Sequence, residues 1–144
     1  MIREATLEDL ESIVKLENTF GVEAFSRKSL RFFIVNRSTH VLEKNDEVIG
    51  YTIVRFRKGS TYARLYSITV SEEHRGRGYS KHLLGSAEMY AIDRGMDRMG
   101  LEVAESNSIA IALYKLAGYT VTKKITDYYS DGQSCIKMIK NLSH

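Results

Sequence analysis

A short stretch rich in glycine and arginine lies near the middle of this 144-residue chain. Residues 70–84 read V-S-E-E-H-R-G-R-G-Y-S-K-H-L-L, so an apolar run leads into a turn and then into a helical pattern. The start of a helix offers up to four unpaired N–H groups and about half a positive charge, and anions bind there. Gly76 and Gly78 let a ligand approach the backbone closely. The cations of the turn are Arg75, Arg77 and Lys81. The stretch therefore predicts a site for a phosphate or pyrophosphate group.

Two better-known phosphate loops do not match this stretch. A Walker A loop needs Ser or Thr after its lysine, whereas Lys81 is followed by His82. A dinucleotide fingerprint needs a third glycine where Lys81 stands. The alternative that stays open is a solvated basic turn whose glycines only permit a tight bend.

Two further residues are of types used in acid–base chemistry. Glu102 lies in a predicted strand over residues 98–104, where Leu101 and Val103 alternate with it, so its side chain points away from their face. Tyr114 lies on a predicted helix and shares one face with apolar residues. Taken alone, the first is typical of a solvated strand residue and the second of a core aromatic. Their functional interpretation depends on the surrounding sequence.

Three blocks together resemble the GCN5-related N-acetyltransferase (GNAT) superfamily. Residues 75–80, R-G-R-G-Y-S, are similar to its acyl-CoA signature [QR]-x-x-G-x-[GA], with Ser80 in place of Gly or Ala. Residues 101–119, L-E-V-A-E-S-N-S-I-A-I-A-L-Y-K-L-A-G-Y, closely resemble a block of the protein N-terminal acetyltransferases, including the RimI-type ribosomal-protein-alanine enzymes. Residues 128–132, Y-Y-S-D-G, resemble their Y-Y-x-D-G hairpin. The blocks stand in family order, and the resemblance covers essentially the whole chain.

This resemblance implies transfer of the acetyl group of acetyl-CoA to the N-terminal α-amino group of a protein or peptide, with ribosomal proteins among the candidates. An α-amino group has a pKa of about 8 and is mostly protonated at neutral pH, so the site must remove a proton. By resemblance, Glu102 is the general base, acting through a water, and Tyr114 is the general acid near the CoA sulfur.

The resemblance also implies the binding residues. Backbone groups at the end of the strand before the turn should pair with the pantetheine arm and hold the thioester oxygen. Asn107 should cap the next helix and contact the same arm. The residues expected to contact acetyl-CoA are Ile68, Thr69, Val70, Arg75, Gly76, Arg77, Gly78, Tyr79, Ser80, Lys81, Asn107 and Tyr114. The residues expected to contact the acceptor are Phe20, Phe25, Tyr128 and Tyr129. Each of these aromatics could equally belong to the core or its rim.

The elements that must position these residues follow from periodicity and turn residues. Strands are predicted over Ile2–Thr6, His40–Lys44, Val48–Arg57, Thr61–Val70, Arg98–Ala104, Tyr119–Tyr129 and Gln133–Ile139. Helices are predicted from Thr6 to Phe20, from Ser26 to Asn36, from Gly78 to Arg94, and from Ser106 or Asn107 to Ala117. The strand–helix–strand from Thr61 to Ala104 should be a parallel crossover.

This order predicts an α/β (α+β) fold with a single domain over residues 1–144. The resemblance implies a mixed, mostly antiparallel sheet of about seven strands flanked by about four helices. It also implies that the sheet is splayed open between the strand ending at Val70 and the strand starting near Arg98, with the cofactor in the splay.

Composition limits the remaining function classes. The net charge of +3 favours an anionic ligand, and without a long Lys/Arg run we expect no nucleic-acid partner. Cys135 is the single cysteine, so we expect no disulfide and no metal site. No charged-then-apolar leader begins the chain and no apolar run approaches 18 residues, so we expect a soluble cytoplasmic protein without a membrane partner. The oligomeric state stays open.

Two alternatives compete with N-terminal acetylation. One is acetylation of a lysine or of a small amine such as a polyamine or an aminoglycoside. A polyamine site needs several carboxylates, and Glu23, Asp127 and Asp131 form no obvious cluster in the sequence. The other is a non-catalytic acyl-CoA-binding module, which would have no use for the pair Glu102 and Tyr114.

Overall fold

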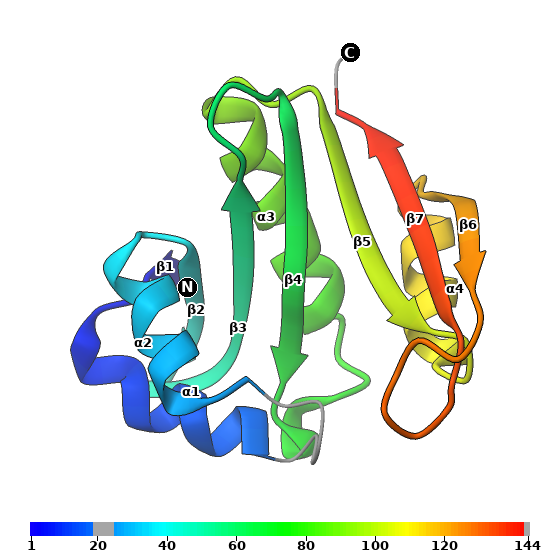
Figure 1. Cartoon of the computed structure of the whole chain (residues 1–144). Helices are drawn as coiled ribbons and strands as arrows, with labels where there is room; N and C mark the ends of the chain where they lie inside the picture. The colour runs from blue at the N-terminus through cyan, green and yellow to red at the C-terminus, as the bar shows by residue number, and fades with distance from the viewer. Residues whose placement is uncertain (19–24, 143–144) are drawn as a thin grey trace. The chain divides into compact units, whose positions relative to one another are not determined.

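A computed structural model describes residues 1–18 and 25–142. Within them, seven strands and four α-helices follow one another in the predicted order (Figure 1). The strands are β1 (Ile2–Glu4), β2 (Thr39–Lys44), β3 (Glu47–Phe56), β4 (Tyr62–Val70), β5 (Arg98–Ala104), β6 (Thr120–Ile125) and β7 (Cys135–Asn141). The helices are α1 (Leu10–Glu17), α2 (Arg27–Val35), α3 (Tyr79–Asp93) and α4 (Ser108–Leu116). The predicted fold class is confirmed.

The strands pair in the order β1-β2-β3-β4-β5-β7-β6. The pairs β1/β2, β2/β3, β5/β7 and β6/β7 are antiparallel. β4 and β5 are parallel, with Tyr62–Leu65 opposite Arg98–Leu101, so the predicted crossover is confirmed. Beyond Leu101, β5 continues to pair with β7 as far as Ala104.

The chain divides into two compact units. The first comprises residues 1–54 and 67–87, and the second comprises residues 55–66 and 88–144. β3, β4 and α3 contribute residues to both units.

The helices of the first unit begin near the predicted positions, because capping residues stand there. Thr6 and Asp9 form a capping box at the 3₁₀ turn that leads into α1, and Asp9 also pairs with Arg3 at 2.8 Å. The Oγ of Ser26 accepts a hydrogen bond from the Ser29 N–H at the start of α2. Buried apolar residues of these helices and of β2 and β3 form the core cluster: Ala5, Ile13, Leu30, Phe33, Ile34, Val41, Tyr51 and Ile53.

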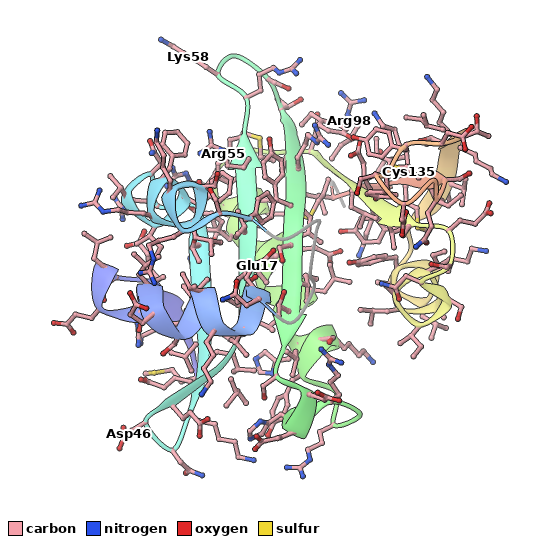
Figure 2. All side chains as sticks on the ribbon, turned by 60° about the horizontal axis from the view of Figure 1, so that its bottom comes forward. Glu17, Asp46, Arg55, Lys58, Arg98 and Cys135 are labelled. Atoms are coloured by element: carbon pink, nitrogen blue, oxygen red, sulfur yellow. The ribbon has the colours of Figure 1, made fainter. Side chains whose placement is uncertain are left out.

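A carboxylate lies within this unit at the end of α1 (Figure 2). Glu17 is 4% exposed and accepts hydrogen bonds from the Tyr51 hydroxyl and, at 2.8 Å, from the Phe25 N–H. Burial raises the pKa of Glu17, although the Phe25 N–H opposes the shift. The carboxylate therefore ties the backbone before α2 to the end of α1 and to β3.

A second cluster of the first unit supports the end of β4. It consists of Leu42, Ile49, Val70 and Leu83. Gly50 lies on β3, where an added Cβ would come within 2.7 Å of the Thr69 carbonyl oxygen. The close approach of the two backbones therefore requires glycine, and it places the strand end that precedes the Gly/Arg turn.

In the second unit, β5 pairs with the first half of β4 and with β7, and β6 completes the hairpin. The Tyr62 ring covers Gly100, so that a Cβ at Gly100 would overlap its hydroxyl. Asn107 caps α4, with its Oδ1 accepting from the Ala110 N–H at 3.2 Å, and Gly118 follows the helix with a φ of 102°. Both predicted helix ends are confirmed.

The extent of the last hairpin differs from the prediction. The strand predicted to run to Tyr129 ends at Ile125, and its partner begins at Cys135 rather than at Gln133. Asp127 adopts a left-handed φ of 52°, and both Tyr128 and Tyr129 donate backbone hydrogen bonds to the Gln133 carbonyl. These bonds close a loop and remove the segment from the strand ladder. Nowhere in the two described ranges does a helix have the length and apolar character needed to span a membrane.

Candidate active site

The Gly/Arg turn of the first unit connects β4 to α3. A 3₁₀ turn over Glu72–His74 precedes it, and α3 begins at Tyr79. Gly76 and Gly78 have φ angles of 78° and 82°, and among the described residues no atom beyond the adjoining ones lies within 4 Å of a Cβ built on either. Glycines in this left-handed conformation turn backbone N–H groups toward one side, and a ligand could approach them without obstruction.

Side chains hold this turn to its own unit. The Arg75 Nε donates to the Val70 carbonyl at 3.2 Å, and Ser71 Oγ lies 2.6 Å from His74 Nδ1. The Tyr79 hydroxyl accepts from Lys44 Nζ at 2.9 Å, which anchors the first residue of α3. The exposed cations of the turn are Arg75, Arg77 and Lys81. Open glycines, a helix start and exposed cations are groups that fit a pyrophosphate.

The three residues before the turn are packed into the first unit. The side chains of Thr69 and Val70 are buried, and Ile68 packs against the second cluster. Ser67 Oγ and Thr69 Oγ1 are 3.1 Å apart. With their side chains engaged in this way, the backbone is what these residues could offer to a ligand.

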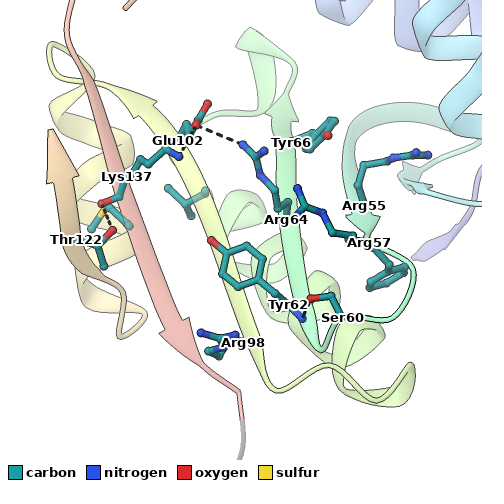
Figure 3. A pocket seen from close by; sticks show the side chains of 13 residues that line it. Arg55, Arg57, Ser60, Tyr62, Arg64, Tyr66, Arg98, Glu102, Thr122 and Lys137 are labelled. Atoms are coloured by element: carbon teal, nitrogen blue, oxygen red, sulfur yellow. Dashed lines mark hydrogen bonds and ion pairs between the residues drawn. The ribbon is translucent and has the colours of Figure 1, made fainter. Parts of the chain in front are cut away.

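Glu102 lies on β5 in the second unit, and its side chain is 20% exposed. Its Oε1 accepts a 2.9 Å hydrogen bond from the Tyr128 hydroxyl. Its Oε2 lies 3.4 Å from Arg64 Nη2 and 3.4 Å from Lys137 Nζ (Figure 3). Donors from β4, β7 and the loop between β6 and β7 therefore fix the direction of this carboxylate.

A cavity of about 600 Å³ opens beside this carboxylate, entirely within the second unit (Figure 3). Its lining residues are Arg55, Phe56, Arg57, Ser60, Tyr62, Arg64, Tyr66, Arg98, Leu101, Glu102, Thr122, Lys137 and Met138. Five of these side chains are cationic, and Glu102 is the one carboxylate among them. The volume is in the range of small-ligand sites.

Tyr114 lies on α4 of the same unit and is half-buried. Its ring meets that of Tyr119 edge-on, with centroids 5.8 Å apart. The Tyr119 hydroxyl in turn donates to Glu88 at 2.8 Å, and Lys140 contacts the other oxygen of Glu88 at 3.0 Å. Burial raises the pKa of Tyr114 to about 12. The phenol is therefore protonated at neutral pH.

This raised pKa predicts a change in stability at alkaline pH. Between about pH 10, where an unfolded tyrosine titrates, and about pH 12, folded Tyr114 retains a proton that the unfolded chain has lost. Its contribution to stability is thus complete below pH 10 and is lost as the pH rises through 12. The free energy of unfolding should fall less steeply over this window in Tyr114→Phe than in the wild type, as measured by urea denaturation at each pH. Equal slopes in the two proteins would contradict the raised pKa.

The predicted acceptor residues lie in different places. Tyr128 is 46% exposed, its ring is edge-on to Tyr129 with centroids 5.0 Å apart, and it contacts Glu102. Tyr129 is half-buried, and burial raises the pKa of its phenol. Phe25 belongs to the first unit, where it packs on Phe33 at a centroid distance of 5.3 Å. The remaining predicted contact, Phe20, lies outside the described residues.

Sequence reasoning did not identify Arg64 and Lys137 as partners of Glu102. A signal was present in the alternation of β4, since Tyr62, Arg64 and Tyr66 share one face of that strand. Assigning them to the side of Glu102 requires the register of β4 against β5, which sequence alone does not supply. Among the described residues, no group of three or more His, Cys, Asp and Glu side chains is placed to hold a metal ion.

Comparison with known proteins gives consistent matches. The sequence model described as the acetyltransferase (GNAT) family matches residues 7–119. An N-alpha-acetyltransferase of Sulfurisphaera tokodaii is 30% identical, with 95% of this chain and 90% of that protein aligned. Ard1 from Thermoplasma volcanium superposes with a TM-score of 0.92 at 24% identity, covering 100% of this chain and 98% of that one. The ribosomal-protein-S18-alanine N-acetyltransferase from Escherichia coli superposes with a TM-score of 0.87 at 25% identity, covering 100% and 94%.

Proposed function

The chain belongs to the GNAT family of acetyltransferases and is an acetyl-CoA-dependent N-acetyltransferase, and from this premise we propose that its acceptor is the N-terminal α-amino group of a protein or peptide. The observation that carries the proposal is the carboxylate of Glu102, held by Tyr128, Arg64 and Lys137 beside a cavity large enough for the start of a polypeptide. The relative from Sulfurisphaera tokodaii, an N-alpha-acetyltransferase, supports the same acceptor class.

Binding of acetyl-CoA is proposed for the residues predicted from the sequence. The exposed glycines and cations of the turn from Arg75 to Lys81 would hold the pyrophosphate, with the start of α3 adding its N–H groups. Backbone groups of Ile68–Val70 would pair with the pantetheine amides, because their side chains are occupied within the first unit. The side chain of Asn107 already caps α4, so capping would be its main role and a contact with the pantetheine arm a secondary one.

In the proposed chemistry, acetyl-CoA supplies an acetyl group as a thioester. Glu102, acting through a water, takes the proton that the ammonium group must lose before its nitrogen can react. The amine nitrogen forms a bond to the acetyl carbon while the carbon–sulfur bond breaks. Tyr114 donates its proton to the departing sulfur. The second proton, which the nitrogen loses as the amide forms, passes through the water to solvent, from which Tyr114 regains one. A backbone N–H near Val70 would stabilise the negative charge on the carbonyl oxygen.

We also propose that the 144 residues act as one acetyltransferase domain. The family match extends over residues 7–119 and so includes parts of both units. A ribosomal protein is one acceptor to be tested, because the similar Escherichia coli structure is that of a ribosomal-protein-S18-alanine enzyme.

The charges of the cavity disfavour a polyamine acceptor. Spermidine is a polycation and requires carboxylates, whereas the described lining residues include five cations and one carboxylate. A peptide amine carries a single positive charge, which Glu102 can accommodate.

The proposal is tested with acetyl-CoA and three acceptors. The first is a short peptide with a free N-terminus, the second is the same peptide with a blocked N-terminus and an internal lysine, and the third is spermidine. We expect acetylation of the free N-terminus, located by mass spectrometry. Turnover of spermidine or of the lysine without turnover of the free N-terminus would refute the acceptor class. Binding of acetyl-CoA without turnover of any amine would favour a non-catalytic module.

A further inference from the structure

The cavity of the second unit has an unusual balance of charge for a site that receives a cationic amine. Arg55, Arg57, Arg64, Arg98 and Lys137 line it together with one carboxylate. Glu102 is already paired with two of these cations, so the cavity retains an excess of positive charge. The transfer of a proton from one amine to Glu102 gives the remaining cations of the cavity no role.

The cations lie at different distances from the carboxylate. Arg64 and Lys137 contact Glu102 directly, whereas Arg98 stands four residues earlier on β5, which corresponds to about 13 Å of strand. Figure 3 shows Glu102 and Arg98 at opposite ends of this part of β5. An extended peptide rises by about 3.3 Å per residue, so about four residues would bridge the two ends.

Arg98 is held in a position that keeps its charge available. Its guanidinium lies over the Tyr62 ring, 5.3 Å from the centroid, and its contact with Asp97 is 3.5 Å long. About half of the Arg98 side chain is exposed. Arg57 lines the same cavity and is exposed as well. These groups can bind carboxylates without first losing a buried partner.

From this arrangement we propose that the enzyme prefers acceptors whose second to fourth residues include Asp or Glu. This inference rests on the proposed function, because it takes the acceptor amine to lie at Glu102. The amine then sits at the only carboxylate among the described lining residues, and the next side chains of the acceptor meet Arg57 and Arg98. Opposite charges across such a surface raise the association rate and select partners.

A polypeptide fits these observations better than a nucleic acid. The carboxylate of Glu102 stands inside the cavity, where it would repel a phosphate backbone, but it matches the charge of an N-terminal ammonium. The cavity thus has one anionic position for the amine and several cationic positions for the second and later residues of the acceptor.

The test compares three peptides that share one first residue and differ only at positions two to four, which are acidic, neutral amide or basic. We expect kcat/KM to be about tenfold higher for the acidic peptide than for the neutral one, since several exposed ion pairs each contribute a few-fold. The preference should shrink when NaCl is raised from about 0.05 M to about 0.5 M.

Arg57 and Lys58 are neighbours in the sequence, so their Gln variants form a matched pair, and Arg98 supplies a further variant. Arg57→Gln and Arg98→Gln should each reduce, by about threefold, the ratio of kcat/KM for the acidic peptide to kcat/KM for the neutral one. Lys58→Gln removes the same charge from the tip of the adjacent turn, where the side chain points away from the chain and does not line the cavity (Figure 2). This variant should keep the full preference.

Each outcome separates this inference from the proposed function. Equal acetylation of the acidic and neutral peptides would overturn the inference and leave N-terminal acetylation intact. Acetylation of no peptide at all would refute the proposed function. Equal loss in Lys58→Gln and Arg98→Gln would overturn the assignment to the cavity. Inhibition by a short RNA that Arg57→Gln and Arg98→Gln relieve, without any acidic preference, would assign the cavity to nucleic acid instead.

Discussion

Glu102→Gln should lower the rate of acetylation by about a hundredfold to ten-thousandfold, the usual contribution of a general base. Glutamine has the same shape and can still accept the hydrogen bond that the Tyr128 hydroxyl donates to Oε1. It cannot take a proton, and it no longer pairs with Arg64 and Lys137. The loss should therefore appear in kcat, measured with a good peptide acceptor at saturating acetyl-CoA.

Affinity for acetyl-CoA should stay within about twofold in the same variant, because the residues proposed to bind the cofactor are unchanged. Isothermal titration calorimetry measures this directly. The matched control is Glu105→Gln, which alters an exposed carboxylate three residues farther along the chain that pairs with Lys124 at 2.6 Å. Glu105→Gln should keep kcat within about twofold, since an exposed ion pair contributes little. An unchanged kcat in Glu102→Gln would show that another group is the base.

Gly78→Glu should weaken acetyl-CoA binding by about a hundredfold. The φ of 82° at this residue disfavours any side chain, and the new carboxylate would stand where the pyrophosphate is proposed to bind. Losing a charge-assisted hydrogen bond and adding repulsion accounts for a change of this size. The dissociation constant of CoA, measured by calorimetry, is the readout.

Gly59→Glu is the matched control for backbone strain. Gly59 has nearly the same φ, 79°, and an added Cβ there would also have no non-adjacent atom of the described residues within 4 Å, but Gly59 lies in the turn between β3 and β4. Both variants should lose similar stability in thermal denaturation, and only Gly78→Glu should lose CoA affinity. If CoA binds both variants as tightly as the wild type, the pyrophosphate assignment is wrong.

Arg77→Ala should weaken the affinity for CoA only a few-fold, because it removes one exposed cation.

Short-range signals were sufficient for the order and type of the elements. The caps at Ser26 and Asn107 and the left-handed glycine at 118 act within a few residues of the chain, so their effects can be read from the sequence. The Gly/Arg turn is also local, and its open glycines stand where the sequence predicted them. The family resemblance rested on the same kind of contiguous pattern, and the family match supports it.

The limits of the last hairpin were not predictable in this way. Tyr128 and Tyr129 are residues that favour strands, and the sequence around them continues an apparent strand pattern. In the structure their N–H groups bond to Gln133, and the loop turns one phenol toward Glu102. The backbone bonds that close this loop, together with the tertiary contact between Tyr128 and Glu102, outweighed the preference of the tyrosines for a strand.

The sequence by itself therefore determined which elements form, where the Gly/Arg turn lies and which residues are candidates for acid–base chemistry. Only the tertiary structure decided that Arg64, Lys137 and Tyr128 meet at Glu102, and that five cations share one cavity. The physical reason is that caps and turns depend on neighbours along the chain, whereas these contacts depend on strand register across β4, β5 and β7. A shift of one residue in that register would turn these side chains to the opposite face.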